Sequence, residues 1–128
     1  MSSCVLDASA ILAFFKGEPG ADRVRVALAE GVVVGAVNLA EAVTKLSESG
    51  EPETAIRGLV YGLDPEIVPF DEDLAYATGL LRPLTRHLGL SLGDRACLAL
   101  AQRLGLPALT ADRAWAALQI GVVIEVVR

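Results

Sequence analysis

The sequence predicts a three-layer α/β/α fold whose central sheet has five mostly parallel strands. Five short apolar runs are continuous rather than alternating, which is typical of strands buried on both faces of a parallel sheet. Ala- and Leu-rich stretches with helical spacing lie between these runs, and strands that alternate with helices indicate right-handed crossovers. The 128 residues are the length of one domain, so we expect residues 1–128 to form a single domain.

In the first half of the chain, Cys4–Leu6 ends at a carboxylate and predicts the first strand. The run Val32–Val37, which follows a glycine, predicts the second strand. Loops rich in Gly and Pro are expected over 17–20 and 49–52. Helical spacing predicts four helices, over Ala8–Phe15, Asp22–Ala29, Leu39–Ser47 and Glu53–Leu63.

In the second half, Ile67–Pro69 ends at a proline and predicts the third strand. Pro107 opens the fourth strand, Ala108–Leu109, and Gly121 precedes the fifth, Val122–Val127. Helical spacing predicts three further helices, over Glu72–Leu84, Leu92–Leu104 and Arg113–Leu118.

Composition excludes several classes of protein. Hydrophobic residues make up 53% of the chain and charged residues 21%, which excludes intrinsic disorder. No apolar run approaches the roughly 18–20 residues of a membrane span, and the first residues lack the basic start of a secretory signal. We therefore expect a cytoplasmic protein without a membrane partner.

The chain has two cysteines, Cys4 and Cys97, and one histidine, His87. They are too few and too far apart in the sequence for a disulfide framework or a zinc site. The formal net charge of −5 does not indicate a basic surface for nucleic acid. An acidic chain can instead hold metal ions, which reverse the local charge.

Four acidic residues occupy informative positions. Asp7 ends the first strand, Glu41 lies one turn into the helix after the second, Asp94 opens a long apolar helix, and Asp112 follows the fourth strand. Each also fits a structural role, because Asn38-x-x-Glu41 and Ser91-x-x-Asp94 resemble capping boxes and Asp7 and Asp112 fit N-caps.

Taken together, these acids predict a metal site. The carboxyl ends of parallel strands and the helices after them share the edge of the sheet where such folds bind ligands. Asp94 joins the others there if its helix packs beside the first strand. Carboxylates gathered in a crevice repel one another unless a cation neutralises them, and oxygen ligands favour Mg²⁺, with Mn²⁺ as an alternative.

The segments around these acids resemble the PIN-domain family, and in particular the VapC-type toxin ribonucleases of toxin–antitoxin pairs. The segments that carry the resemblance are Val5–Ala10, Asn38–Ala42, Leu90–Ala96 and Leu109–Arg113, in an order and spacing that cover nearly the whole chain. The resemblance implies that Asp7, Glu41, Asp94 and Asp112 form the catalytic metal site. Ser9 and Thr110 match the family's hydroxyl positions, where they orient a carboxylate or a hydrating water.

The resemblance further implies a Mg²⁺-dependent endoribonuclease, the toxin of a type II pair, that forms a homodimer and is neutralised by a cognate antitoxin. A metal-activated water would attack the phosphodiester bond, with Glu41 orienting or deprotonating it. Arg95 and Arg113, each beside a site carboxylate, are candidates for holding phosphate; the alternative, which we favour, is a surface ion pair.

Two other functions remain open at this stage. A phosphatase or receiver-type phosphotransfer protein has a similar topology. Such phosphatases have D-x-D after the first strand, where this chain has Asp7-Ala8-Ser9. A receiver needs a lysine near the edge of the sheet, and neither Lys16 nor Lys45 follows a late strand. A non-catalytic PIN-like binding module is the other alternative. An intact set of four acids argues against it, because a scaffold has no reason to gather uncompensated charge.

Overall fold

A computed structural model describes residues 2–128 and shows one five-stranded sheet in which all strands are parallel. The strands are β1 (Cys4–Leu6), β2 (Val32–Gly35), β3 (Glu66–Val68), β4 (Ala108–Thr110) and β5 (Ile124–Val126). Their spatial order is β3-β2-β1-β4-β5, so β1 lies at the centre of the sheet. The predicted α/β class and five-stranded sheet are confirmed.

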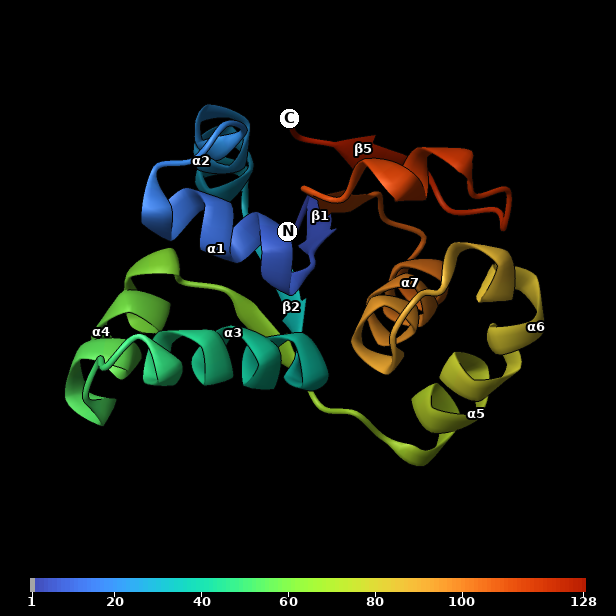
Figure 1. Ribbon diagram of the computed structural model, residues 1–128, viewed down its shortest axis with the longest axis horizontal. Coiled ribbons are helices and arrows are strands. Elements are labelled where there is room, and N and C mark those ends of the chain that lie inside the picture. Colours follow the sequence, from blue (N-terminus) through green and yellow to red (C-terminus); the bar gives the residue numbers. More distant parts are fainter. Residues whose placement is uncertain (1) are drawn as a thin grey trace.

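Over the described residues, seven α-helices and two short 3₁₀ helices connect the strands (Figure 1). The α-helices are α1 (Ala8–Lys16), α2 (Ala21–Glu30), α3 (Ala36–Glu48), α4 (Glu53–Leu63), α5 (Glu72–Leu80), α6 (Arg82–Thr85) and α7 (Leu92–Leu104). The 3₁₀ helices are η1 (Arg86–Leu88) and η2 (Arg113–Ala117). In Figure 1, α1 to α4 lie to one side of the central strands and α5 to α7 to the other.

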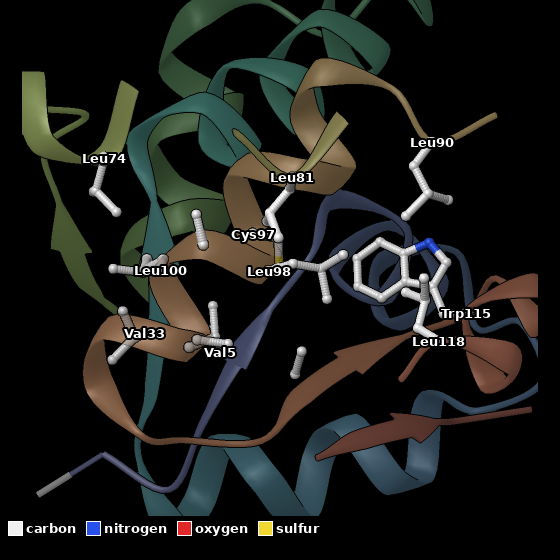
Figure 2. Close-up of a cluster of buried hydrophobic side chains, with 13 residues drawn as sticks. Val5, Val33, Leu74, Leu81, Leu90, Cys97, Leu98, Leu100, Trp115 and Leu118 are labelled. Carbon is white, nitrogen blue, oxygen red and sulfur yellow. The ribbon is translucent and has the colours of Figure 1, made fainter. Parts of the chain in front are cut away.

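Alternate residues of the buried strands divide the core in two. Val5 is paired with Val33 and with Ala108, and these three side chains pack on the face that α5 and α7 cover. Trp115 is fully buried in the same cluster, near Leu98 (Figure 2). The residues on the opposite face pack against α1 and α2: Cys4, Leu6, Val32, Val34 and Leu109. Both faces of the sheet are therefore covered, as the continuous apolar runs predict.

Several predicted boundaries are wrong. The second strand ends at Gly35 rather than Val37, and α3 begins at Ala36 rather than Leu39, because Gly35 is the N-cap. The helix predicted over Glu72–Leu84 is divided into α5 and α6, with Pro83 in the first turn of α6, where a missing N–H is tolerated.

The remaining differences are small. The predicted segment Arg113–Leu118 is a 3₁₀ helix that ends at Ala117, the third strand begins one residue earlier than Ile67, and the fifth is confined to Ile124–Val126. Glu53–Leu63 and Leu92–Leu104 have the predicted bounds. Within residues 2–128, no helix is both long enough and apolar enough to cross a membrane.

Candidate active site

The parallel sheet brings the carboxyl ends of three neighbouring strands to one edge. Asp7 directly follows β1, Thr110 ends β4 beside it, and β2 on the other side leads into α3, which carries Glu41. The site residues predicted from the sequence therefore come from adjacent segments, as expected for a ligand site at the end of a parallel sheet.

Asp7 is the most buried of the four acids, with 3% of its surface exposed. Its Oδ1 accepts hydrogen bonds from the Ala10 N–H at 2.8 Å and from Ser9 Oγ at 2.8 Å, and its Oδ2 accepts one from Thr110 Oγ1 at 2.6 Å. The bond from Ala10 makes Asp7 the N-cap of α1, so the structural role that the sequence offered is present as well.

Burial raises the pKa of Asp7 from 3.8 to about 6. The hydrogen bonds from Thr110, Ala10 and Ser9 oppose this rise, whereas the negative charge of Asp94 adds to it. The carboxylate is thus held firmly in place, yet its negative charge is not compensated.

Ser9 and Thr110 connect the ends of β1 and β4. Besides bonding to Asp7, Ser9 Oγ accepts from the Ala111 N–H at 2.9 Å, and Thr110 Oγ1 accepts from the Asp112 N–H at 3.0 Å. Both hydroxyls therefore orient Asp7 and the turn after β4 in a single hydrogen-bond network.

Glu41 is held against the first turn of α7. The buried Asn38 amide donates to Glu41 Oε1 at 3.0 Å and to the Gly93 carbonyl at 3.0 Å, which ties α3 to α7. A Cβ atom on Gly93 would lie 2.2 Å from Glu41 Oε2, so the carboxylate occupies the space that a side chain would need. Burial raises the pKa of Glu41, the Asn38 hydrogen bond lowers it, and the charge of Asp94 raises it.

Asn38 and Gly93 are functional candidates that the sequence reasoning missed. The pattern Asn38-x-x-Glu41 suggested a capping box, but α3 begins at Ala36, so Asn38 lies inside the helix and caps nothing. Its amide instead faces Glu41, three residues later on the same side of the helix. A glycine in the first turn of an apolar helix was the available signal for Gly93.

Asp94 forms the capping box that the sequence predicts. The Ser91 N–H donates to Asp94 Oδ2 at 3.0 Å, and the Asp94 N–H donates to Ser91 Oγ at 3.1 Å. The Cys97 thiol is fully buried in α7: burial raises its pKa well above the usual value, and the charges of Asp7, Asp94 and Glu41 raise it further. These three carboxylates are thus within electrostatic reach of one buried point.

Asp112 lies at the margin of this group. Its Oδ1 accepts from the Ala114 N–H at 3.0 Å and caps η2, and its connection to Asp7 runs through Thr110. The candidate phosphate ligands also differ in position. Arg95 donates to the Thr78 carbonyl at 3.1 Å, toward α5, whereas Arg113 is exposed beside Asp112. Within residues 2–128 neither forms an ion pair, so the surface ion pair that we favoured is absent for both.

In the described part of the chain, no three acidic, histidine or cysteine side chains lie close enough to ligate one metal ion directly. The chemistry of the donor set nevertheless fits a hydrated divalent cation. All donors are carboxylates, Mg²⁺ retains several waters, and no basic side chain of residues 2–128 forms an ion pair with any of the four acids. Burial, and then the charge of Asp94, raise the pKa of Asp7 and of Glu41, and a bound cation would offset both effects.

Comparisons with known proteins identify a family and related folds. The family model described as PIN domain matches residues 4–120. A toxin–antitoxin complex from Klebsiella pneumoniae has 21% identity and a TM-score of 0.72, covering 94% of this chain and 96% of that one. DNA-bound VapBC from Salmonella typhimurium has 21% identity and a TM-score of 0.73, covering 98% of both chains.

VapC20 from Mycobacterium tuberculosis, a toxin that cleaves the sarcin–ricin loop, has 18% identity and a TM-score of 0.73. The match covers 94% of this chain and 99% of VapC20. At these identities the likeness shows a shared fold. No curated protein sequence matches the chain significantly.

Proposed function

The chain belongs to the PIN-domain family, and from this premise we propose that it is a Mg²⁺-dependent endoribonuclease and the toxin of a type II toxin–antitoxin pair. PIN domains are typically nucleases that use a divalent metal. One observation carries the proposal: the buried, uncompensated Asp7 carboxylate lies at the strand edge within electrostatic reach of Asp94.

Asp7, Glu41, Asp94 and Asp112 are the residues that would hold the cation, with Mn²⁺ as a substitute for Mg²⁺. When bound, the cation activates a water and neutralises charge that develops on the phosphodiester. Asp7 contributes a carboxylate whose orientation is set by Ser9, Thr110 and the N-terminus of α1. Asp94 accepts the Ser91 N–H with Oδ2, which leaves Oδ1 for the site.

Glu41 is suited to orient the attacking water and to take its proton. Asn38 fixes Oε1, so Oε2 remains available, and the raised pKa makes this carboxylate a stronger base than an exposed glutamate. The two side chains lie three residues apart on α3, so the helix itself maintains their geometry.

The partners follow from the likeness to solved toxins. Because one structural neighbour is described as a toxin–antitoxin complex, we propose a cognate antitoxin for this chain. From membership of the PIN-domain family we further propose a homodimer and a cytoplasmic location. RNA is the proposed substrate because PIN domains are typically nucleases and one neighbour is described as a toxin that cleaves the sarcin–ricin loop.

Cleavage of total cellular RNA by the purified protein tests the proposal. We expect discrete products with Mg²⁺, none with EDTA, and none from Asp7→Ala. Asp22→Ala, which removes an exposed carboxylate paired with Arg25, is the matched control and should cleave normally. Absence of cleavage with either metal, together with no Mg²⁺ binding by calorimetry, would instead indicate a non-catalytic binding module.

A further inference from the structure

A second feature lies on the same edge of the sheet, beside the carboxylates. A depression of about 470 Å³ is lined by Ser9, Pro19, Ala111, Asp112, Arg113 and Arg128. We propose that it binds a backbone phosphate of the RNA next to the scissile bond, with Arg113 and Arg128 as its ligands. This inference rests on the proposed function and assigns a substrate contact to residues outside the acidic group.

Three segments that are distant in sequence build the walls of the depression. Pro19 comes from the loop after α1, Ala111 from the turn after β4, and Arg128 from the end of the chain after β5. The loop and the chain end are in close contact, since a Cβ atom on Gly20 would lie 2.7 Å from Val127 Cγ2. Gly20 has φ of +100°, a conformation that favours glycine, and so permits this approach.

The depression is continuous with the candidate active site through Ser9. The Ser9 hydroxyl lines it and also bonds to Asp7 Oδ1 at 2.8 Å. A group bound in the depression is therefore one side chain away from the Asp7 carboxylate. An RNA strand that reacts beside Asp7 extends away from the carboxylates along the surface around them. The depression is the part of that surface that carries Arg113 and Arg128.

Among the described residues, the two arginines of the depression are not engaged by carboxylates, unlike four other arginines of the chain. Arg23, Arg25, Arg57 and Arg103 form ion pairs with Glu125, Asp22, Glu53 and Asp71. Within residues 2–128, Arg113 and Arg128 form none, although Asp112 lines the same depression. Asp112 is instead directed to the N–H of Ala114.

Arg128 is held in a way that suits phosphate. Its Nε–H donates to the Ala111 carbonyl at 3.0 Å, and its two Nη groups make no hydrogen bond with the described residues. A guanidinium fixed at Nε presents the Nη groups as a planar fork, which matches two oxygens of a phosphate. In a chain with a net charge of −5, such local cations are needed to bind a polyanion.

Binding of a fluorescein-labelled, mixed-sequence single-stranded RNA 12-mer tests the proposal. Anisotropy in EDTA over a series of KCl concentrations measures affinity without cleavage. Arg113→Ala should weaken binding about tenfold, the loss of one charge-assisted hydrogen bond, and Arg128→Ala, which removes a fork of two such bonds, should weaken it at least as much. Each should lower the slope of log affinity against log salt by about 0.7. Arg57→Ala, which removes an exposed arginine of α4, is the control and should bind like the wild type.

Arg113 makes no hydrogen bond to the described residues, so its variant tests the site even if Arg128→Ala lowers stability through the lost bond to Ala111. Cleavage by the wild type, with unchanged affinity and salt slope in both variants, would overturn the subsite alone. A wild type that neither binds nor cleaves RNA would overturn the proposed function as well. Inorganic phosphate that binds as tightly as the RNA, through the same arginines, would make this a site for free anions and refute the assignment to RNA.

Discussion

Replacement of Gly93 by alanine separates the stability of the fold from the geometry of the site. Gly93 lies in the first turn of α7, and its backbone is not in the left-handed region. A glycine-to-alanine change inside a helix is ordinarily stabilising, by up to about 1 kcal/mol. Here the added methyl group would meet the Glu41 carboxylate, whose Cδ and Oε2 would lie 2.3 and 2.2 Å away.

The size of the effect follows from these distances. Ordinary van der Waals contact begins near 3.4 Å, so the carboxylate has to move by more than about 1 Å. A misplacement of about 1 Å costs on the order of 100-fold in rate. The carboxylate is the free end of a flexible side chain, so the collision is relieved by a shift of Glu41 rather than of the helices. We predict that Gly93→Ala lowers kcat about 100-fold without lowering Tm.

The assay combines RNA cleavage with thermal unfolding of the same preparation. Gly79→Ala in α5 is the matched control, because a Cβ atom there meets nothing within 4 Å, and it should leave cleavage unchanged. Full activity in Gly93→Ala would refute the role given to Glu41. A loss of several kcal/mol in stability would refute the argument that the side chain alone gives way.

Four further predictions concern stability and metal binding. The pKa of Asp7 is raised from 3.8 to about 6, so the folded state binds a proton at this carboxylate more tightly than the unfolded chain does. The contribution of Asp7 to stability should therefore fall by about 3 kcal/mol as pH rises from 3.8 to 6. Denaturation of the metal-free protein at several pH values measures this loss of stability. Asp7→Asn, whose amide can donate to the Ser9 and Thr110 hydroxyls, should remove the pH dependence. A pH dependence that persists in this variant would contradict the assignment to Asp7. Mg²⁺ should raise the Tm of the wild type but not of Asp7→Asn, and an equal rise in both would place the cation elsewhere. Asn38→Ala should reduce both Mg²⁺ affinity by calorimetry and cleavage, whereas unchanged values would show that Glu41 needs no support. Trp115→Ala should cost about 3–5 kcal/mol in urea denaturation, and a cost below about 1 kcal/mol would argue against its place in the core.

Most of the fold could be predicted from local patterns in the sequence. Continuous apolar runs identified all five strands, and helical spacing identified the segments between them. For β1, β2 and β4 the reason is burial on both faces of the sheet, whereas the edge strand β3 is largely exposed. The start of α3 was missed because the apolar residues Ala36 and Val37 fit the end of a buried strand as well as the start of a helix. The break between α5 and α6 was marked by Pro83, but the helical period continues through it.

The candidate site could be predicted for those residues whose place at the sheet edge depends only on their position after a strand. Asp7 and Asp112 follow strands, so a parallel sheet brings them to one edge whatever the packing of the helices. The roles of Asn38 and Gly93 depend on how α3 meets α7, and the place of Arg128 depends on β5 pairing with β4. These are contacts between segments far apart in sequence, which no local pattern contains. Asp7 and Asp94 cap α1 and α7, so the structural roles that the sequence offered for these two acids are present beside the proposed metal-binding roles.

The chemical ends of the RNA products test the central claim most directly. Hydrolysis by a water held at the Asp7 site leaves a 5′-phosphate on one fragment and a 3′-hydroxyl on the other. We predict these ends, formed only with Mg²⁺ or Mn²⁺ and absent with Asp7→Asn. Products that carry a 2′,3′-cyclic phosphate, or that still form in EDTA, would show attack by the RNA's own 2′-hydroxyl and would contradict a metal-dependent carboxylate site.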